Sequence, residues 1–396
     1  MRRKRVAVFG STGSIGRATL DVIGRMPYRF EVRALAAHSS TRSLLQQARR
    51  HRPAKVAFAD RSAYERARRA GRFKTELCWG LDSLMDIAAS PAVDIVVMAM
   101  SGTMGVLPVI AALEKGKRVA IATKEILVGF GRHVKTCARR SGAELLPIDS
   151  ELSALFQCLD GRDIDSVKRV ILTASGGPFW RKGIPARATV KQVLRHPTWS
   201  MGDKTTVDSA TMMNKGLEVI ETSRLLGLGP DRIDAFIHPQ SIVHSLVEFA
   251  DGSVLAQMSE PDMRLPIQYC LTYPERRPSP ARSLRFAGMP SLEFFPLNRR
   301  RFPCYSLARK ALESGHGAPC VLNAANQVAV DAFLAGQIAF EDIPAIIRAT
   351  LRQYPTEGTS RSRPPSLSAL LRTEARATET AARLVEASRS RAGGRS

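Results

Sequence analysis

The sequence is poor in several features that mark particular protein classes. It has no run of about 18 apolar residues, which argues against a transmembrane helix. Its six cysteines form no CxxC pair and lack zinc-ligand spacing, so we expect reduced thiols in a cytoplasmic protein. Aromatic residues make up only 6% of the chain, and no stacking surface for single-stranded nucleic acid is evident.

Acidic residues are also scarce. The chain has 36 Asp and Glu against 59 Lys and Arg, a formal net charge of +23. Such an excess can indicate nucleic-acid binding. No run of five like charges follows the start and no nucleic-acid motif is present, so we favour an arginine-rich surface and phosphorylated small-molecule ligands. The start, Met1–Gly10, is basic and then briefly apolar, so we expect a first strand there, not a signal or transit peptide.

A glycine-rich turn follows this first strand. Arg5–Phe9 runs into GSTGSIG, residues 10–16, and then into an amphipathic helix from about Ser14 to Gly24. Strand, glycine-rich turn and helix in this order are typical of dinucleotide-binding folds, in which the helix N-terminus faces the pyrophosphate. The spacing is GxxGxxG and departs from the strict GxGxxG, so the prediction depends on this context.

The second predicted strand, Phe30–Ala37, has no acid at its end. NAD-binding folds usually carry Asp or Glu there for the ribose hydroxyls. This chain has a histidine, two serines, a threonine and Arg42 in the residues that follow. Hydroxyls and cations suit a 2′-phosphate, which predicts NADP(H) over NAD(H).

Alternating elements predict the fold class. Strand candidates at 55–59, 94–100, 118–122 and 144–148 with helices between them predict an N-terminal Rossmann-like, doubly wound sheet. Later strands are expected at 168–173, 235–237, 245–249 and 253–258, the last two joined by a hairpin at Ala250–Gly252. Helices are expected at 305–314, 320–335, 341–351 and 366–387, and disorder at 388–396. We therefore expect an NADPH-binding domain at 1–150, a central α/β catalytic domain at 151–290, and a linker with a C-terminal helical domain at 291–396.

Three carboxylates suggest a metal site. Asp149 and Glu151 are two residues apart, on one side of a predicted extended segment, and Glu218 lies on a predicted helix. All-oxygen ligands suit Mg²⁺ or Mn²⁺, and no Cys or His pair competes for a softer metal. The alternative is a solvated strand end, which is the more common fate of such a pair.

The stretch Val207–Glu218 holds the densest polar pattern. With a helix from Thr211, Asn214 and Glu218 lie one turn apart and Lys215 shares their face. Ser209 with Asp208 offers N-cap chemistry, so this helix start would make an anion site. The alternative is a capped surface helix with a solvated face.

Two loops complete the candidate site. Ser175 precedes two glycines at a strand end, where backbone N–H groups can meet a phosphate; the alternative is an ordinary turn. Residues 195–202, with Trp199, have the composition of a mobile lid; the alternative is a structural loop with a core Trp. His238 and His244 are interpreted as structural.

Six motifs in order carry a family resemblance: PIDSE, SGGPF, HPTWSMG, VDSATMMNKGLE, IHPQS and EPDMR. The chain resembles the 1-deoxy-D-xylulose 5-phosphate reductoisomerase family from GSTGSIG to LNAAN. The resemblance implies a homodimer that uses NADPH and Mg²⁺ or Mn²⁺ to make 2-C-methyl-D-erythritol 4-phosphate for isoprenoid biosynthesis. The usual account is a retro-aldol/aldol rearrangement, followed by hydride reduction of a branched aldehyde.

The resemblance also assigns residues. The cofactor residues would be Thr12, Gly13, Ser14, Ile15, His38, Ser39, Ser40, Thr123, Glu125 and Gly202. The metal ligands would be Asp149, Glu151 and Glu218, and these three with Lys124 form the catalytic set. The residues in contact with substrate would be Lys124, Ser150, Glu151, Ser175, His196, Trp199, Ser209, Asn214, Lys215, Glu218 and Met263. Ser175, Ser209, Asn214 and Lys215 would meet its phosphate, and Trp199 would belong to a closing flap.

The chain departs from the family pattern in two places. Leu152 stands where the family usually has His, which bears on catalytic efficiency, and Thr123 stands where it often has Asn. Two alternatives stay open: an NADPH-dependent oxidoreductase that acts on another phosphorylated sugar, and a weakened binding protein.

Overall fold

The computed structural model describes residues 2–71, 73–315, 317–354 and 365–393. It divides into two compact units. Unit 1 consists of residues 1–126, 132–153 and 262–283. Unit 2 consists of residues 127–131, 154–261 and 284–396. No helix in the described part of the chain is both long enough and apolar enough to cross a membrane.

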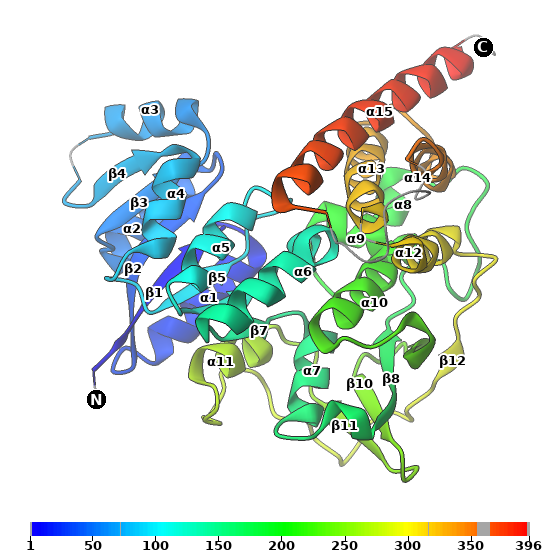
Figure 1. Cartoon of the computed structure of the whole chain (residues 1–396), viewed down its shortest axis with the longest axis horizontal. Coiled ribbons are helices and arrows are strands. Elements are labelled where there is room, and N and C mark those ends of the chain that lie inside the picture. The colour runs from blue at the N-terminus through cyan, green and yellow to red at the C-terminus, as the bar shows by residue number, and fades with distance from the viewer. Residues whose placement is uncertain (1, 72, 316, 355–364, 394–396) are drawn as a thin grey trace. The chain divides into compact units, whose positions relative to one another are not determined.

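Unit 1 contains a fully parallel sheet in the order β4-β3-β2-β1-β5-β6-β7 (Figure 1). The strands are β1 Lys4–Phe9, β2 Phe30–Ala37, β3 Lys55–Phe58, β4 Glu76–Trp79, β5 Ile95–Met98, β6 Arg118–Ile121 and β7 Leu145–Pro147. The predicted doubly wound sheet is confirmed. The edge strand β4 was not predicted, because its four residues are half-exposed and carry no clear alternation.

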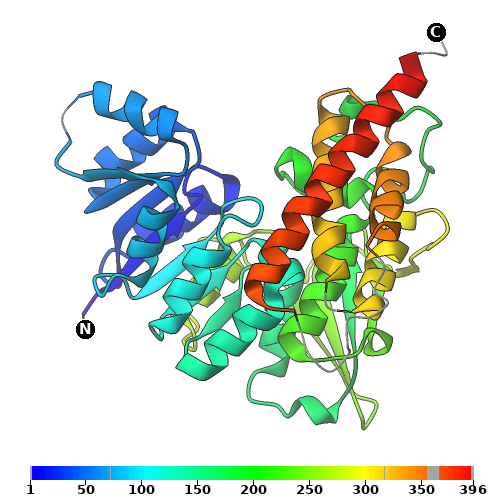
Figure 2. The same ribbon diagram turned by 45° about the horizontal axis from the view of Figure 1, so that its top comes forward.

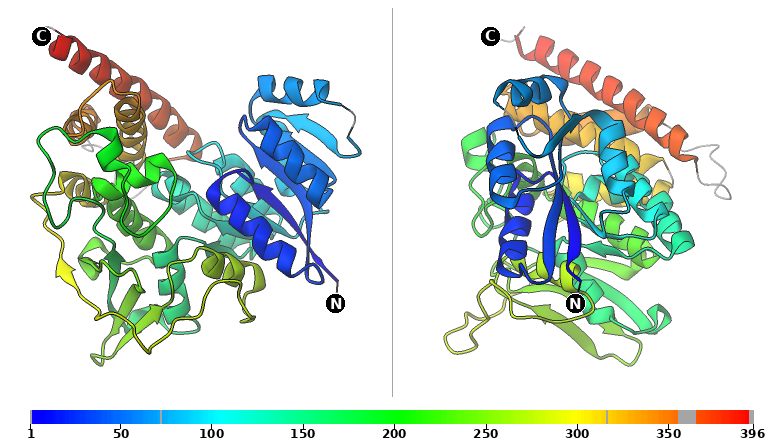
Figure 3. Two further views of the ribbon diagram at one scale, coloured as in Figure 1. Left: turned by 180° about the vertical axis from the view of Figure 1, so that it is seen from behind. Right: turned by 90° about the vertical axis from the view of Figure 1, so that its left-hand side faces the viewer.

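Helices cover both faces of this sheet, as the right-hand view of Figure 3 shows. They are α1 Ser14–Arg25, α2 Thr41–His51, α3 Arg61–Arg69, α4 Gly80–Ala89, α5 Val106–Glu114 and α6 Lys124–Ser141. A late helix, α11 Arg264–Thr272, joins them and packs against α1, β6 and β7. It is fixed there by polar contacts: Arg118 Nη1 donates to Leu271 O at 3.2 Å, and Arg264 pairs with Asp21 at 3.3 Å.

Two glycines of the first turn are required by geometry. Gly10 has φ +81°, and a Cβ there would lie 2.2 Å from the carbonyl oxygen of Ala99. A Cβ at Gly16 would lie 2.3 Å from the carbonyl oxygen of Gly10. Side chains are therefore excluded where the turn passes β5 and where α1 begins, which is the packing role of glycine in a dinucleotide-binding turn.

Unit 2 is built on a five-stranded sheet in the order β11-β10-β8-β9-β12. Its strands are β8 Val167–Ala174, β9 Ile233–Ile237, β10 Val243–Phe249, β11 Val254–Met258 and β12 Phe295–Pro296. Only β8 and β9 run parallel. The predicted hairpin between β10 and β11 is confirmed: Gly252 has φ +87°, and Asp251 Oδ1 accepts from the backbone N–H of Ser253 at 2.9 Å.

The helices of unit 2 pack over one large apolar core. They are α7 Ser150–Leu159, which starts in unit 1, α8 Val190–Val193, α9 Asp203–Ala210, α10 Met213–Leu226, α12 Pro303–Ser314, α13 Ala318–Leu334, α14 Asp342–Arg352 and α15 Leu367–Gly393. Short 3-10 turns lie at Ile164–Ser166 and Pro230–Arg232. Figure 2 shows the long α15 lying along α13.

The C-terminal prediction needs one correction. Disorder was expected from residue 388, but α15 continues to Gly393, so the prediction is wrong for 388–393. Residues 394–396, and residues 355–364 between the last two predicted helices, lie outside the described residues. The division into three domains stays a prediction.

Candidate active site

The helix α1, which follows the glycine-rich turn, begins without a side-chain cap. Gly13 is the N-cap of α1, and no side chain caps that end. Gly13 and Ser14 are exposed, and Thr12 and Ile15 are half-buried. The first N–H groups of a helix with no side-chain cap suit a phosphate, both as donors and through the helix dipole.

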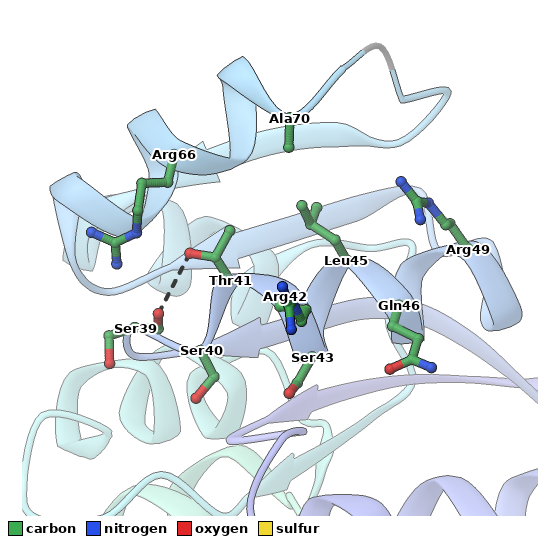
Figure 4. A pocket seen from close by; sticks show the side chains of 10 residues that line it. All are labelled: Ser39, Ser40, Thr41, Arg42, Ser43, Leu45, Gln46, Arg49, Arg66 and Ala70. Carbon is green, nitrogen blue, oxygen red and sulfur yellow. Dashed lines mark hydrogen bonds between the residues drawn. The ribbon is translucent and has the colours of Figure 1, made fainter.

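A groove of 860 Å³ continues from the end of β2 along α2 and α3. His38, Ser39 and Ser40 are exposed at its start. The groove is lined by Ser39, Ser40, Thr41, Arg42, Ser43, Leu45, Gln46, Arg49, Arg66 and Ala70. Figure 4 shows Arg66 on α3 near the Ser39–Thr41 turn, with Arg42 and Arg49 on α2. Three guanidinium groups and a row of hydroxyls therefore follow the strand end at which adenosine binds in such sheets.

The start of α6 carries three of the predicted residues. Thr123 is buried, and its hydroxyl donates to Met100 O at 2.6 Å, which ties the ends of β5 and β6 together. Lys124 follows, and its Nζ lies 3.0 Å from Asp149 Oδ2. Both side chains of this pair are largely buried, with 12% and 14% exposed. Glu125 is buried in the first turn of α6.

Asp149 and Glu151 do not lie on an extended segment, and that prediction is wrong. The strand β7 ends at Pro147, and α7 begins at Ser150. Asp149 Oδ1 accepts from the backbone N–H groups of Glu151 at 3.2 Å and Leu152 at 3.4 Å, so Asp149 caps this helix. Glu151 is in the first helical turn and accepts from the hydroxyl of Ser150 at 2.5 Å. Both carboxylates thus come from one helix start.

Leu152 is the residue for which the family resemblance led us to expect His. Its side chain is buried, with 3% exposed. The fold therefore accommodates an apolar residue at this position.

Unit 2 brings Ser175, His196 and Ser209 together; we call them the serine–histidine cluster. His196 Nε2 lies 2.9 Å from Ser175 Oγ and 3.1 Å from Ser209 Oγ. Ser175 follows β8, and Ser209 is near the end of α9. Three residues far apart in sequence, from a strand end, the predicted flap and a helix, therefore meet at one point.

The backbone fixes the tautomer of His196. Its Nδ1 accepts from the N–H of Trp199 at 2.8 Å and of Thr198 at 3.2 Å, so Nδ1 carries no proton. In the neutral ring the proton is then on Nε2, which faces the two serines. Burial lowers the pKa of His196 to about 4, so the ring is neutral at pH 7. Any positive charge for an anion at this cluster must come from another residue.

Asn214, Lys215 and Glu218 form a second cluster in unit 2, which we call the α10 cluster. Asn214 Nδ2 donates to Glu218 Oε1 at 2.5 Å, and Lys215 Nζ pairs with Glu218 Oε2. The side chains of Lys215 and Glu218 are only 4% and 1% exposed. The predicted shared helix face is confirmed for these three residues, and a buried lysine this close to a buried carboxylate keeps both charges paired.

The predicted start of this helix is wrong. Asp208 and Ser209 end the preceding helix α9 and do not cap α10. Thr211 also lies before α10, and Met212 adopts φ +59° between the two helices. No side chain caps the start of α10 at Met212. The break turns one predicted helix into two, and each carries part of the candidate site.

The remaining predicted residues are more dispersed. Trp199 is half-buried, and its ring lies 6.2 Å from that of His244. Gly202 is the N-cap of α9, and Met263 is the N-cap of α11 in unit 1. His238 and His244 are buried and bonded within the fold; His238 Nε2 accepts from Val243 N at 3.1 Å.

Two residues, Arg66 and Asn326, were not predicted from the sequence. Arg66 lines the α2–α3 groove, but its position on a separate helix hid it. Asn326 belongs to the LNAAN motif and donates to Asp208 at 2.9 Å. The signal for Asn326 was an amide among the apolar residues Leu322, Ala325, Ala329 and Val330 at helical spacing, since a buried amide needs a partner.

The parallel sheet with its glycine-rich turn, together with serine, lysine and carboxylate clusters, defines a dinucleotide-binding α/β oxidoreductase. The sequence matches the family "1-deoxy-D-xylulose 5-phosphate reductoisomerase" over residues 6–131. It matches the corresponding C-terminal domain over 145–226 and the "DXP reductoisomerase C-terminal domain" over 258–380. The chain therefore belongs to the 1-deoxy-D-xylulose 5-phosphate reductoisomerase family.

Individual members of this family match the chain over most of their own length. The 1-deoxy-D-xylulose 5-phosphate reductoisomerase of Pelotomaculum thermopropionicum is 49% identical over 89% of this chain and 92% of its own. That of Protochlamydia amoebophila is 45% identical over 96% and 98%. The Zymomonas mobilis enzyme solved with NADPH has a TM-score of 0.88 at 39% identity, over 97% of this chain and all of its own. A DOX-P reductoisomerase with NADPH, fosmidomycin and magnesium has a TM-score of 0.91 at 39% identity, over 97% and 98%.

Proposed function

We propose that this protein converts 1-deoxy-D-xylulose 5-phosphate into 2-C-methyl-D-erythritol 4-phosphate, with NADPH and a divalent metal ion, in non-mevalonate isoprenoid biosynthesis. The observation that carries the proposal is membership of the reductoisomerase family along nearly the whole chain, over both units. Solved relatives bound to NADPH, fosmidomycin and magnesium support the cofactor and the metal.

The cofactor is proposed to bind at the carboxyl edge of the parallel sheet. Thr12 to Ile15 would hold its phosphates at the start of α1, and Thr123, Glu125 and Gly202 would line the rest of its site. His38, Ser39 and Ser40 would meet the adenosine end, where the arginines of the α2–α3 groove favour a 2′-phosphate. NADPH supplies the hydride for the reduction.

We expect Arg42→Ala to weaken the preference for NADPH. Arg42 is exposed in the groove beside Ser40, where a guanidinium can pair with the 2′-phosphate. Loss of such a pair costs about 1.5 kcal/mol, so KM for NADPH should rise about tenfold while the slow reaction with NADH changes little. Arg50→Ala is the matched control, because Arg50 is exposed on α2 and does not line the groove. Equal effects on both cofactors would remove Arg42 from the 2′-phosphate site.

The donor set fits a divalent cation. We propose Asp149, Glu151 and Glu218 as its ligands, three carboxylates that together could hold such an ion. Hard oxygen ligands suit Mg²⁺ or Mn²⁺. The cation, when bound, acts as a Lewis acid on substrate oxygens. Lys124, paired with Asp149, is positioned to stabilise negative charge on an oxygen or to transfer a proton at its Nζ.

The substrate phosphate is proposed to bind in unit 2. Ser175 and Ser209 offer hydroxyls that already share a hydrogen-bond partner in His196. Asn214 adds an amide, and Lys215 adds the charge that neutral His196 lacks. Closure of the 195–202 flap, with Trp199, over the substrate would exclude water from the reacting carbons, with Ser150 and Met263 as further contacts.

The proposal is tested by NADPH oxidation at 340 nm with purified protein. We expect turnover of 1-deoxy-D-xylulose 5-phosphate with Mg²⁺ or Mn²⁺, and its loss when EDTA is added. A folded, NADPH-binding protein that does not turn over the substrate with either metal would contradict the proposal.

We further propose a homodimer in a reducing, cytoplasmic setting. The six cysteines are free, and burial raises the pKa of Cys270 to about 12, which suits inert thiols. The edge strand β11 exposes Val254 and Leu255 at 48% and 38%, which suits a partner surface.

Light scattering should give twice the chain mass of 43.3 kDa. Leu255→Asp should shift the mass toward that of one chain, because a charge would be buried at the interface. Asp251→Asn in the adjoining turn is the control. A monomeric wild type would exclude the dimer, and a Leu255→Asp dimer would place its interface elsewhere.

A further inference from the structure

A buried polar contact joins the flap side of the site to the C-terminal helices. Asp208 on α9 is 1% exposed, and its Oδ1 accepts from Asn326 Nδ2 on α13 at 2.9 Å. Its Oδ2 lies 2.8 Å from Lys204 Nζ, one turn earlier on α9. Asn326 is fully buried. Figure 1 shows α9 beside α13.

The same short helix carries a residue of the serine–histidine cluster. Ser209 follows Asp208 directly, and side chains of successive helical residues diverge by about 100°. Asp208 therefore holds α9 on the α13 side, while Ser209 Oγ reaches His196 Nε2 at 3.1 Å. Thr211 Oγ1 donates to Asp208 O at 3.2 Å, which ties the same residue to the break before α10.

A buried carboxylate needs its partners in place, so this contact has one favoured geometry. A rotation of α9 would separate Asp208 from Asn326 and would move Ser209 away from His196. Gly202, at the end of the predicted flap, is the N-cap of the same helix. The contact between Asp208 and Asn326 thus holds α9, the end of the flap at Gly202 and the hydroxyl of Ser209 in place.

We propose that Asp208 and Asn326 are positioning residues, which together form an anchor that sets Ser209 for the substrate phosphate. The proposal rests on the proposed function, because it assumes that Ser209 meets that phosphate. It assigns a role to the Asn of LNAAN and gives the C-terminal helices a part in substrate recognition.

The test is a double-mutant cycle with Asn326→Ala and Asp208→Ala, each of which removes the hydrogen bond between the two side chains. KM for 1-deoxy-D-xylulose 5-phosphate should rise about tenfold in Asn326→Ala, the scale expected for a misplaced binding group, with kcat changed less. KM for NADPH should not change. The double variant should be no more impaired than the more impaired of the two single variants, because each single substitution already removes the Asp208–Asn326 contact. Gln327→Ala on α13 and Asp203→Asn on α9 are matched controls. Gln327 donates to Asp331 at the surface, and Asp203 is exposed.

Two further measurements separate positioning from stability. Activity on unphosphorylated 1-deoxy-D-xylulose should be equal in Asn326→Ala and wild type, since no phosphate is present to be misplaced. Melting temperatures identify variants that fold poorly, and Asn326→Ser then replaces Asn326→Ala. Variants that melt lower but keep the wild-type KM would overturn the anchor. Wild type that does not turn over the phosphorylated substrate would instead reject the proposed function.

Discussion

Glu218→Gln is expected to abolish most turnover while NADPH binding stays intact. Glu218 is buried at 1% exposure, bonded to Asn214 and paired with Lys215. The neutral amide keeps the size but removes the charge that we propose as a metal ligand. Metal activation contributes several kcal/mol, and a loss of about 4 kcal/mol lowers kcat/KM about 10³-fold. The measurement is steady-state NADPH oxidation, together with fluorescence titration of NADPH.

Glu221→Gln is the matched control for this variant. Glu221 is also buried, at 2% exposure, and lies one turn further along α10. Its substitution should leave turnover within a few-fold of wild type. The affinity for Mn²⁺, followed by electron paramagnetic resonance, should fall only in Glu218→Gln. Near-normal turnover in that variant would remove Glu218 from the metal site.

Lys215→Ala is expected to raise KM for the phosphorylated substrate about 100-fold, with a smaller effect on kcat. His196 of the serine–histidine cluster is neutral at pH 7. We therefore propose that the positive charge for the phosphate comes from the ammonium of Lys215 in the α10 cluster. A charge-assisted contact of this kind contributes about 2–3 kcal/mol, which corresponds to that change. Activity on unphosphorylated 1-deoxy-D-xylulose should hardly change.

A control variant and two further measurements accompany this prediction. Lys191→Ala removes an exposed lysine from α8 and should leave KM unchanged. Lys215→Ala also removes the ion pair between Lys215 and Glu218, so the melting temperature and the Mn²⁺ affinity of this variant are measured alongside. An unchanged KM in a folded Lys215→Ala variant would exclude Lys215 from the phosphate site.

The parallel sheet was predictable because its signals are local. Val6 to Phe9, Val96 to Met98 and Val119 to Ile121 are fully buried apolar runs, and each is followed by a turn or a helix start. Gly10 and Gly16 could be assigned roles from their place between a strand and a helix, and the structure gives the close contacts that explain them. The edge strand β4 escaped because a half-exposed strand of four residues carries too little pattern.

The start of α7 and the α9–α10 break show what local patterns miss. Asp149 two residues before Glu151 has the spacing of an extended segment, but the Asp149 carboxylate caps a helix instead. Between α9 and α10 the sequence has neither Gly nor Pro, and Met212 takes the left-handed conformation. Tertiary packing of Asp208 and Met213 in the core overrides the local preference there.

Long-range contacts outside the set of residues that the family resemblance assigns could not be predicted. The helix α11 packs against α1, although about 240 residues separate Arg264 from its partner Asp21. Asp208 and Asn326 are 118 residues apart. A single sequence indicates that a buried amide needs a partner, but it does not identify which carboxylate is in reach.

The most direct test of the proposed reaction is the structure of its product. Carbon-13 nuclear magnetic resonance of labelled 1-deoxy-D-xylulose 5-phosphate, incubated with the protein, NADPH and Mg²⁺, distinguishes a rearranged carbon skeleton from a linear one. We predict 2-C-methyl-D-erythritol 4-phosphate, with one NADPH oxidised per molecule formed. A linear 1-deoxypentitol phosphate would contradict this, because it would mean reduction without rearrangement.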